Sequence, residues 1–524
     1  MPAADRRRWW ALGVLGLVTA VIGLDLMVLN VALPTLARDL DASTSNLQWF
    51  ANAYSLVLAA VLLPAGMLGD RYGRKKFILV SLGMFGAASL ACAYSQTAGQ
   101  LIAARLLLGL GAAFLMPLSM SVLTVLFEGA ERARAVTILV TGNALGLPLG
   151  PIVGGLLLDH FWWGSVFLIN IPVIVLALVA AAVLLPESRD PNASRLDVPG
   201  VALSSAGLVS LTYGVIEIGD VGWSDAPALG WIGLGVVLLA AFALWQRRLT
   251  RRPGGQPLVD VGLFRSPGFT WGVITATLAT FAMFGIFFAM PQFFQAVDGA
   301  DALGIGLRLL PFIVGLMAGA RVGDQLLKRL GSGVVIAIGF LTFGVGLVIG
   351  ALMSVDSGYA YIATWFGIVG VGTGLALPAA MNAALGALSP ARSGVGSALI
   401  QAVRQVGGAI GVAVLGSILN STYRNAVDVS QLPPQAAGLV RRGVTAGVAV
   451  ADQLGSAALR LAVQDAFVGA TRALLFTCAG IAVLGVAIGL LFLPRRRRPP
   501  ADSTPPFEAG VVADRAESEA DVVG

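Results

Sequence analysis

The chain has 524 residues, of which 57% are hydrophobic and only 12% are charged, and its mean hydropathy is +0.85. This composition excludes an ordinary soluble globular protein, and it is far too apolar for a disordered chain. The net charge is +6, so the positions of the basic residues decide what that charge means.

Long apolar runs recur along the whole chain. About 20 apolar residues are needed to cross the hydrocarbon core of a bilayer, so runs of about 18 or more indicate spanning helices. The sequence therefore predicts an all-α integral membrane protein with fourteen spans. They begin near Trp10, Gln48, Phe77, Gln100, Ala135, Ser165, Val201, Leu229, Phe269, Leu303, Gly333, Tyr359, Val395 and Thr471.

The basic residues lie mainly on one side of these spans. With the N-terminus inside, the inner segments carry most of the arginines and lysines, whereas the short outer loops carry only Arg38. The positive-inside rule then predicts a multi-pass plasma-membrane protein with both termini in the cytoplasm. This asymmetry accounts for the positive charge without a nucleic-acid partner.

The first span contains one formal charge, Asp25, within the apolar run from Trp9 to Pro34. A charge inside hydrocarbon is costly, so an intramembrane acid is expected to face a cavity and to have a function. The single histidine, His160, falls in a predicted outer loop, so a buried proton carrier has to be a carboxylate. Asp25 is the best candidate.

Arg105 of the fourth span is expected in the same layer as Asp25. At 1.5 Å per residue, Asp25 lies about 12 Å below the outer end of its helix, and Arg105 lies a similar distance below the outer end of its own. Asn52 and Tyr54 of the second span fall close to this layer, so an acid, a base and hydrogen-bonding groups converge on one buried polar site. The alternative is a static ion pair that only joins two helices.

The loop after the second span forms a tight turn with an acid among basic residues. Its candidate residues are Gly69, Asp70, Arg71, Gly73 and Arg74. The basic residues alone are typical of topology determinants. Asp70 among them, with glycines suited to the turn, favours a conformational latch between neighbouring helices.

Glycines recur every four residues in the fifth span, which predicts a smooth helix face where another backbone approaches closely. Pro148 and Pro151 remove backbone hydrogen bonds and favour a bend. Close packing alone would explain the glycines, but the combination favours a hinge. The candidate hinge residues are Gly142, Gly146, Gly150, Pro151, Gly154 and Gly155.

Later spans contribute two further features. Phe281, Phe284 and Phe288 line one face of the ninth span, which is typical of a core or lipid-facing stripe but could also bind flat cations. Arg404 lies about nine residues into the thirteenth span, deep enough to need a partner that the sequence does not identify.

An internal repeat divides the chain. Six pairs, including Gly109 with Gly370 and Gly155 with Gly416, are separated by 261 residues, which indicates two homologous six-helix halves. Eight spans separate the repeats, so spans seven and eight are an insertion. The predicted divisions are an N-terminal half at 1–190, the two-helix insertion at 191–255 and a C-terminal half at 256–495. The C-terminal half contains a long external loop at about 420–470 that could form an interfacial helix. Residues 496–524 are predicted to form a disordered cytoplasmic tail.

Several of these stretches resemble the fourteen-helix drug:proton antiporters of the major facilitator superfamily, and the resemblance extends along the whole chain. It rests on Leu24 to Pro34, Gly66 to Lys76, Leu101 to Ala113, Gly142 to Gly155, Trp162 to Pro172 and Arg404 to Gly408. It implies a major facilitator fold in which Asp25 is the protonation and cation-recognition acid and Arg105 its regulator. Asn30, in the first of these stretches, is a further candidate for the substrate cavity.

The implied function is proton-driven export of hydrophobic, often cationic, drugs or toxic compounds by a monomer in the lipid bilayer. No cofactor is expected, because the proton gradient supplies the energy and no GxxxxGK[ST] motif occurs. An exporter dedicated to one endogenous antibiotic or metabolite would use the same architecture. A non-transporting sensor or enzyme is a more distant alternative, and no span holds the constellation of histidine, cysteine and acid that it would need.

Overall fold

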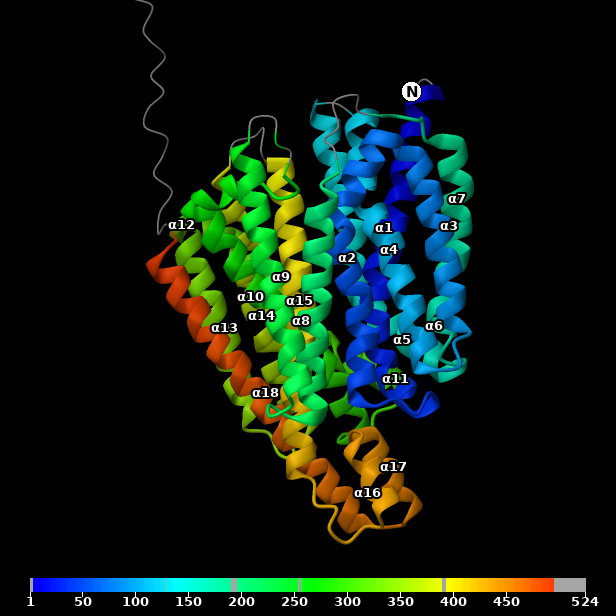
Figure 1. Ribbon diagram of the computed structural model, residues 1–524, viewed down its shortest axis with the longest axis vertical. Coiled ribbons are helices and arrows are strands. Elements are labelled where there is room, and N and C mark those ends of the chain that lie inside the picture. Colours follow the sequence, from blue (N-terminus) through cyan, green and yellow to red (C-terminus); the bar gives the residue numbers. More distant parts are fainter. Residues whose placement is uncertain are drawn as a thin grey trace, which may run out of the picture.

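The computed structural model describes residues 3–127, 129–189, 196–252, 255, 257–388 and 393–493. Over these residues it is a bundle of long helices that lie side by side (Figure 1). The predicted tail at 496–524 lies outside them. The longer helices are α1 (Ala3–Asp39), α2 (Thr44–Tyr72), α3 (Arg74–Ala93), α4 (Ala98–Leu126), α5 (Gly129–His160), α7 (Asn170–Leu184), α8 (Val198–Val221), α9 (Ala226–Arg251), α10 (Pro267–Ala296), α12 (Leu310–Leu330), α13 (Ser332–Ala351), α14 (Tyr359–Gly386), α15 (Ser393–Ala426) and α18 (Ala457–Leu491). The shorter ones are α6 (Ser165–Leu168), η1 (Val261–Arg265), α11 (Ala302–Arg308), α16 (Pro434–Arg441) and α17 (Val444–Gln453).

The predicted set of spans is confirmed. Thirteen helical segments of the described chain are long and apolar enough to cross a membrane, with α6 and α7 forming one segment and α11 and α12 another. α5 is the fourteenth, since its 32 residues reach about 48 Å at 1.5 Å per residue.

The segment predicted as an external loop is helical. α15 continues to Ala426 and α18 already begins at Ala457, and between them α16 and α17 form what we call the helical cap. The cap buries Val440, Val444 and Val450. It lies at the end of the bundle opposite the N-terminus (Figure 1), and we call these two ends the cap side and the N-terminal side.

Glycines of the repeat make equivalent contacts in the two halves. A Cβ on Gly109 of α4 would lie 2.6 Å from the Tyr54 carbonyl oxygen of α2, and Gly370 of α14 faces the Phe312 carbonyl of α12 in the same way. Only glycine allows two helix backbones to approach so closely. The 261-residue spacing therefore corresponds to equivalent helix pairs.

The last pair of the repeat joins the halves. Gly155 of α5 lies against α11, where its Cβ would be 2.7 Å from the Leu303 Cα. Gly416 of α15 lies against the side chain of Gln48 of α2. Both contacts lie toward the cap side, so this end of the bundle holds the halves together.

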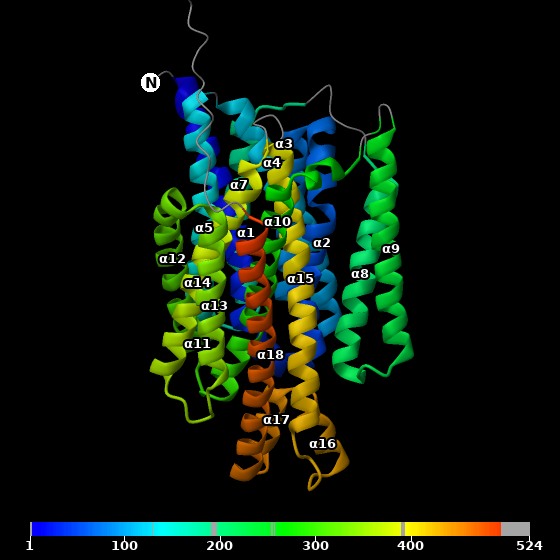
Figure 2. The same cartoon turned by 90° about the vertical axis from the view of Figure 1, so that its left-hand side faces the viewer.

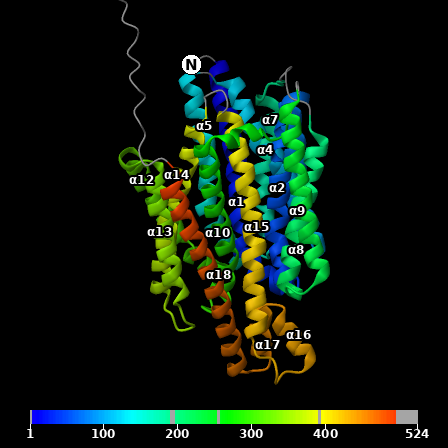
Figure 3. The ribbon, with the colours of Figure 1, turned by 60° about the vertical axis from the view of Figure 1, so that its left-hand side comes forward.

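The hairpin formed by α8 and α9 lies at the edge of the bundle, with α8 beside α2 and α15 (Figures 2 and 3). Its polar contacts go to α15, where the Ser417 hydroxyl donates to the Val215 carbonyl at 2.7 Å. Asn420 donates to Asp220 at 2.7 Å. Toward α2 the contact is apolar and includes Leu208 and Leu56.

Candidate functional site

Asp25 and Arg105 meet inside the first half of the bundle. Arg105 Nη1 lies 2.7 Å from Asp25 Oδ2, and the two side chains are only 1% and 2% exposed. A buried pair of this kind is costly to desolvate and strongly destabilising to break, because the remaining charge would be unpaired. The layer expected from helix lengths therefore exists, and the two charges are in direct contact within it.

α2 completes the surroundings of Arg105. Arg105 Nε donates to the Phe50 carbonyl at 3.2 Å, and its guanidinium lies 4.7 Å from the centre of the Tyr54 ring. A cation above an aromatic face is attracted by the ring quadrupole, and more strongly where water is excluded. Arg105 is thus held by an acid, a carbonyl and a ring from two different helices.

Asn170 is a partner of Asp25 that the sequence reasoning missed. Its amide donates to Asp25 Oδ1 at 3.4 Å and to the Ser89 hydroxyl at 3.2 Å. Asn170 is the first residue of α7, where the sixth span breaks after α6, and Pro172 occupies the first turn, where a missing N–H costs no intrahelical bond. The sequence signal that could have identified it is an amide within an apolar span, and the structure buries this amide fully.

The glycine face of α5 lies against α1 at the level of Asp25. A Cβ on Gly146 would lie 2.5 Å from the Leu24 backbone nitrogen, and one on Gly150 would lie 2.6 Å from the Met27 Cβ. Gly154 is less tightly packed, at 3.4 Å from Val28. The two backbones therefore touch on either side of the acid.

A second face of α5 contacts the other half. Gly306 of α11 packs on the Pro151 carbonyl, and Gly155 packs on Leu303. α5 thus contacts both the helix of the acid and the opposite half within one short stretch. Gly142 lies in α5, but its surroundings and those of Pro148 lie outside the described side chains.

The predicted latch lies within one half. Asp70 accepts from Arg74 Nε at 2.7 Å across the turn between α2 and α3, where Gly73 has φ +127°. Gly69 packs on Leu118 of α4. Arg71 lies over the Tyr72 ring, with its Cζ 5.5 Å from the ring centre.

An additional acid, Glu187, binds this turn from the segment after α7. Its carboxylate accepts from the backbone N–H groups of Lys75 and Lys76, both at 3.3 Å. A carboxylate at the start of a helix satisfies free N–H groups and interacts well with the helix dipole. The turn therefore ties α2, α3 and the segment after α7 to one another.

Arg404 of α15 is coordinated by neutral groups. Its Nε donates to the Thr280 hydroxyl at 3.1 Å, and its Nη1 donates to Gln401 Oε1 at 3.2 Å and contacts the Met381 sulfur at 3.6 Å. No acid pairs with it among the described residues. The partner that the sequence left open is therefore a set of neutral groups from α10, α14 and α15.

Within the described structure, the other cavity candidates form no hydrogen bond with Asp25 or Arg105. The Asn30 amide donates to the Leu26 carbonyl of its own helix at 3.2 Å. The Asn52 amide is fully buried and has no hydrogen-bond partner in the described structure. Phe281 and Phe284 of α10 are partly exposed and lie against the α15 glycines Gly411 and Gly408, whereas Phe288 is fully buried.

Residues 15–412 match the Major Facilitator Superfamily, and the chain belongs to this superfamily of membrane transporters. Multidrug efflux pump LfrA of Mycolicibacterium smegmatis is 33% identical over 92% of this chain and 96% of its own length. The methyl viologen resistance protein SmvA of Salmonella typhimurium is 32% identical over 93% and 98%. The tetracenomycin C resistance and export protein of Streptomyces glaucescens is 30% identical over 97% and 95%.

Solved structures show the same fold. A bacterial homologue of the human lysosomal transporter Spinster, in an inward-facing and unoccupied conformation, superposes with a TM-score of 0.66. The alignment covers 92% of this chain and 96% of the other at 16% identity, so the likeness concerns the fold alone. The resemblance to major facilitator drug exporters is confirmed by the family and by these relatives.

Proposed function

We propose that this transporter exports hydrophobic, often cationic, compounds across the plasma membrane in exchange for protons. The observation that carries the proposal is the buried Asp25–Arg105 pair. A carboxylate in this position binds either a proton or a cationic substrate, so one site serves both ligands by competition. The multidrug efflux relatives support the export of such compounds.

In the proposed cycle, Asp25 meets the substrate from the cytoplasm, and a proton displaces it on the outer side. Burial disfavours a charged carboxylate, whereas a neighbouring arginine favours it. Moving Arg105 relative to Asp25 would therefore change the affinity of the acid for a proton. The N-terminal side is the cytoplasmic side in this proposal, as the distribution of arginine and lysine favours.

We assign the coupling between site and gate to α5. Its glycine face touches α1 beside Asp25, and Pro151 with Gly155 touches α11 of the other half. Interfaces of packed backbones change between discrete arrangements more readily than they deform continuously. A change at Asp25 would thus shift the contact between the halves on the cap side. The turn around Asp70 and Arg74 would hold α2 and α3 as one body during this movement.

Reconstituted liposomes with an imposed proton gradient test the proposal. Ethidium, a hydrophobic monovalent cation, should accumulate against its gradient with the wild-type protein and not with empty liposomes or with Asp25→Asn. The Asn side chain keeps the size of the acid but has neither its charge nor its titratable proton. Accumulation by Asp25→Asn at the wild-type rate would leave the ion pair as a static joint between helices.

A dedicated antibiotic exporter is the second candidate, because relatives of similar identity include the tetracenomycin C resistance and export protein. A gene deletion distinguishes the two functions. Increased sensitivity to several unrelated cationic drugs supports multidrug export, whereas unchanged sensitivity to all of them supports a single dedicated substrate.

A further inference from the structure

Among the thirteen apolar helical segments of the described chain, α9 has the smallest share buried inside the protein. Only 11% of its most apolar stretch is buried inside the protein, against 67% for α1, and it packs mainly on α8 (Figure 2). A groove of about 540 Å³ lies near its N-terminal-side end. The floor is apolar and is formed by Leu203 of α8 with Ala241 and Leu244 of α9.

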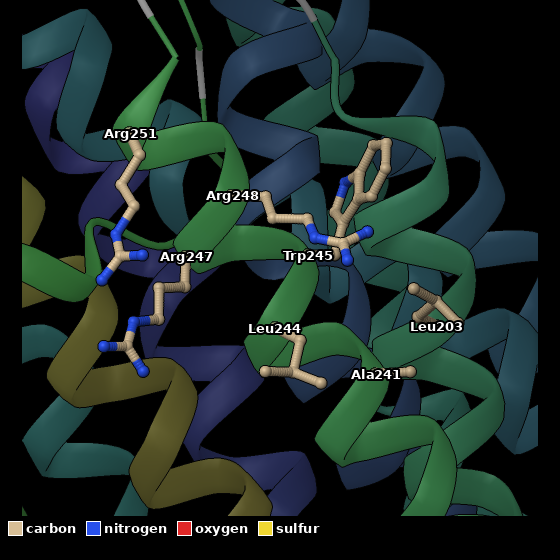
Figure 4. A pocket seen from close by; sticks show the side chains of 7 residues that line it. All are labelled: Leu203, Ala241, Leu244, Trp245, Arg247, Arg248 and Arg251. Atoms are coloured by element: carbon tan, nitrogen blue, oxygen red, sulfur yellow. The ribbon is translucent and has the colours of Figure 1, made fainter.

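Three arginines line the same groove. Arg247, Arg248 and Arg251 lie on the last turns of α9; in the view of Figure 4, Arg247 and Arg251 extend to the left and Arg248 extends to the right, beside Trp245. All three are exposed, and none forms an ion pair with another described residue. The mouth of the groove therefore carries three positive charges next to an apolar floor.

The acid of this corner is already engaged. Asp197, which caps α8, accepts from Trp245 Nε1 at 2.9 Å and from Gln246 Nε2 at 2.6 Å, and it also accepts from the Gly200 N–H at 3.0 Å. These bonds fix the indole of Trp245 in the wall of the groove. The carboxylate of Asp197 forms no ion pair with the three arginines in the described structure. Within the described part of the chain, Asp197 therefore does not neutralise the three arginines.

We propose that the groove binds a phospholipid with an anionic headgroup from the cytoplasmic leaflet. Guanidinium groups bind phosphate oxygens through paired hydrogen bonds. Basic pockets at this membrane depth suit anionic headgroups, and an indole suits the interface. The anionic headgroup binds at the arginine-lined part of the groove, and an acyl chain follows Leu203 and Leu244 into the bilayer. The positive-inside rule alone would explain arginines at this end of α9. It would not explain why they line a groove with an apolar floor.

Quenching of Trp245 by phospholipids with brominated acyl chains tests the proposal in the full-length purified protein. The signal of Trp245 is the difference between the wild type and Trp245→Phe. Brominated phosphatidylglycerol should quench it at lower concentration than brominated phosphatidylcholine. Each arginine near a membrane surface is worth roughly a fivefold change in affinity, so single Arg→Gln variants should weaken the preference by about that factor. Equal quenching by the two lipids in the wild type would overturn the proposal.

Two sets of variants keep the test specific, each measured with and without Trp245→Phe. Replacing Arg247, Arg248 and Arg251 with Gln should abolish the preference. Replacing Arg321, Lys328 and Arg329, three exposed basic residues at the N-terminal-side end of α12, should leave it intact. An equal loss in both variants would mean that bulk charge, and not the groove, attracts the lipid.

Ala241→Phe keeps the arginines and fills the floor, so it should weaken quenching by the brominated chains. Full quenching in this variant would contradict the assignment of the acyl chain. Soluble glycerophosphoglycerol, which is the headgroup without chains, should compete poorly. Complete displacement of the lipid by an equal concentration of this compound would make the groove a simple anion site and overturn the proposal.

Discussion

The two halves place different side chains at the same register of equivalent helices. Arg105 of α4 forms the buried pair with Asp25, whereas Phe366, which follows it by the repeat spacing of 261 residues, lies at this position of α14. Phe366 is fully buried in an aromatic cluster, with ring centres 5.2 Å from Phe312 and 5.4 Å from Trp365. The second half therefore has apolar packing where the first has a charge pair.

The second half has its own arginine within a span, Arg404, which is half-buried and lies in different surroundings. Arg404 is held by a hydroxyl, an amide oxygen and a sulfur, and no acid pairs with it in the described residues. A neutral set of partners cannot exchange a proton for a cation at the pH of a cell. Under the proposed function, charge exchange therefore belongs to the first half, whereas the contacts of Arg404 join α10, α14 and α15.

Asp25→Asn should have the largest effect, because it leaves Arg105 with only neutral partners, as Arg404 has. Addition of a cationic substrate to wild-type protein in weak buffer should release a proton at pH values where the acid is protonated. The Asn variant should release none. Asp25→Glu restores the acid on a longer side chain and should recover part of the release with a changed pH dependence. A pH-sensitive dye measures all three, and wild-type release from the Asn variant would locate the proton elsewhere.

Truncating the two arginines should have unequal effects. Arg105→Ala leaves Asp25 buried and unpaired, which costs about 3–5 kcal/mol. Arg404→Ala leaves only neutral groups unsatisfied, which costs about 1–3 kcal/mol, so this variant should insert in the membrane and transport more slowly than wild type. Thermal unfolding in detergent measures the difference. Equal destabilisation would indicate that an acid also faces Arg404, and wild-type transport by Arg404→Ala would make that arginine a topological remnant.

α5 and α15, which are equivalent in the repeat, can be compared through their glycine contacts. Gly146→Ala places a methyl group 2.5 Å from the backbone nitrogen of Leu24, and a backbone cannot move aside as a side chain can. Overpacking of this kind costs about 1–3 kcal/mol and should slow transport. Gly407→Ala, the equivalent change, meets the methyl group of Thr277 and should cost less.

Gly154→Ala is the control for this series, because its Cβ would lie at an ordinary 3.4 Å from Val28. Transport rates at matched expression measure the series. Similar rates for Gly146→Ala and Gly154→Ala would exclude a mechanical role for the contact between α1 and α5.

Much of the architecture and the central pair could be predicted from the sequence, because hydropathy, charge asymmetry and helix rise act locally. Asp25 and Arg105 were identified by their cost in an apolar span, and the 261-residue repeat corresponded to equivalent helix pairs. The helical cap was not recognised as folded, because its alanines and valines carry a weak pattern and its core forms only with α15 and α18. Glu187 and Asn170 were missed for a related reason. A single polar residue does not reveal which distant N–H or carboxylate it will face.

Asn170→Ala should have the smallest effect of these variants. It tests whether the Asn170 amide, as well as Arg105, influences the protonation of Asp25. The amide donates to Asp25 Oδ1 at 3.4 Å, which is long for a hydrogen bond, so its loss should cost about 0.5–1.5 kcal/mol. Because a hydrogen bond to a carboxylate stabilises its charged form, its removal should change the pH profile of transport. Ser89→Ala is the matched control, because the Ser89 hydroxyl contacts the same amide without touching the acid. A pH profile measured in liposomes should shift for Asn170→Ala and remain in place for Ser89→Ala. Identical profiles for Asn170→Ala and wild type would mean that Asn170 does not influence the protonation of Asp25.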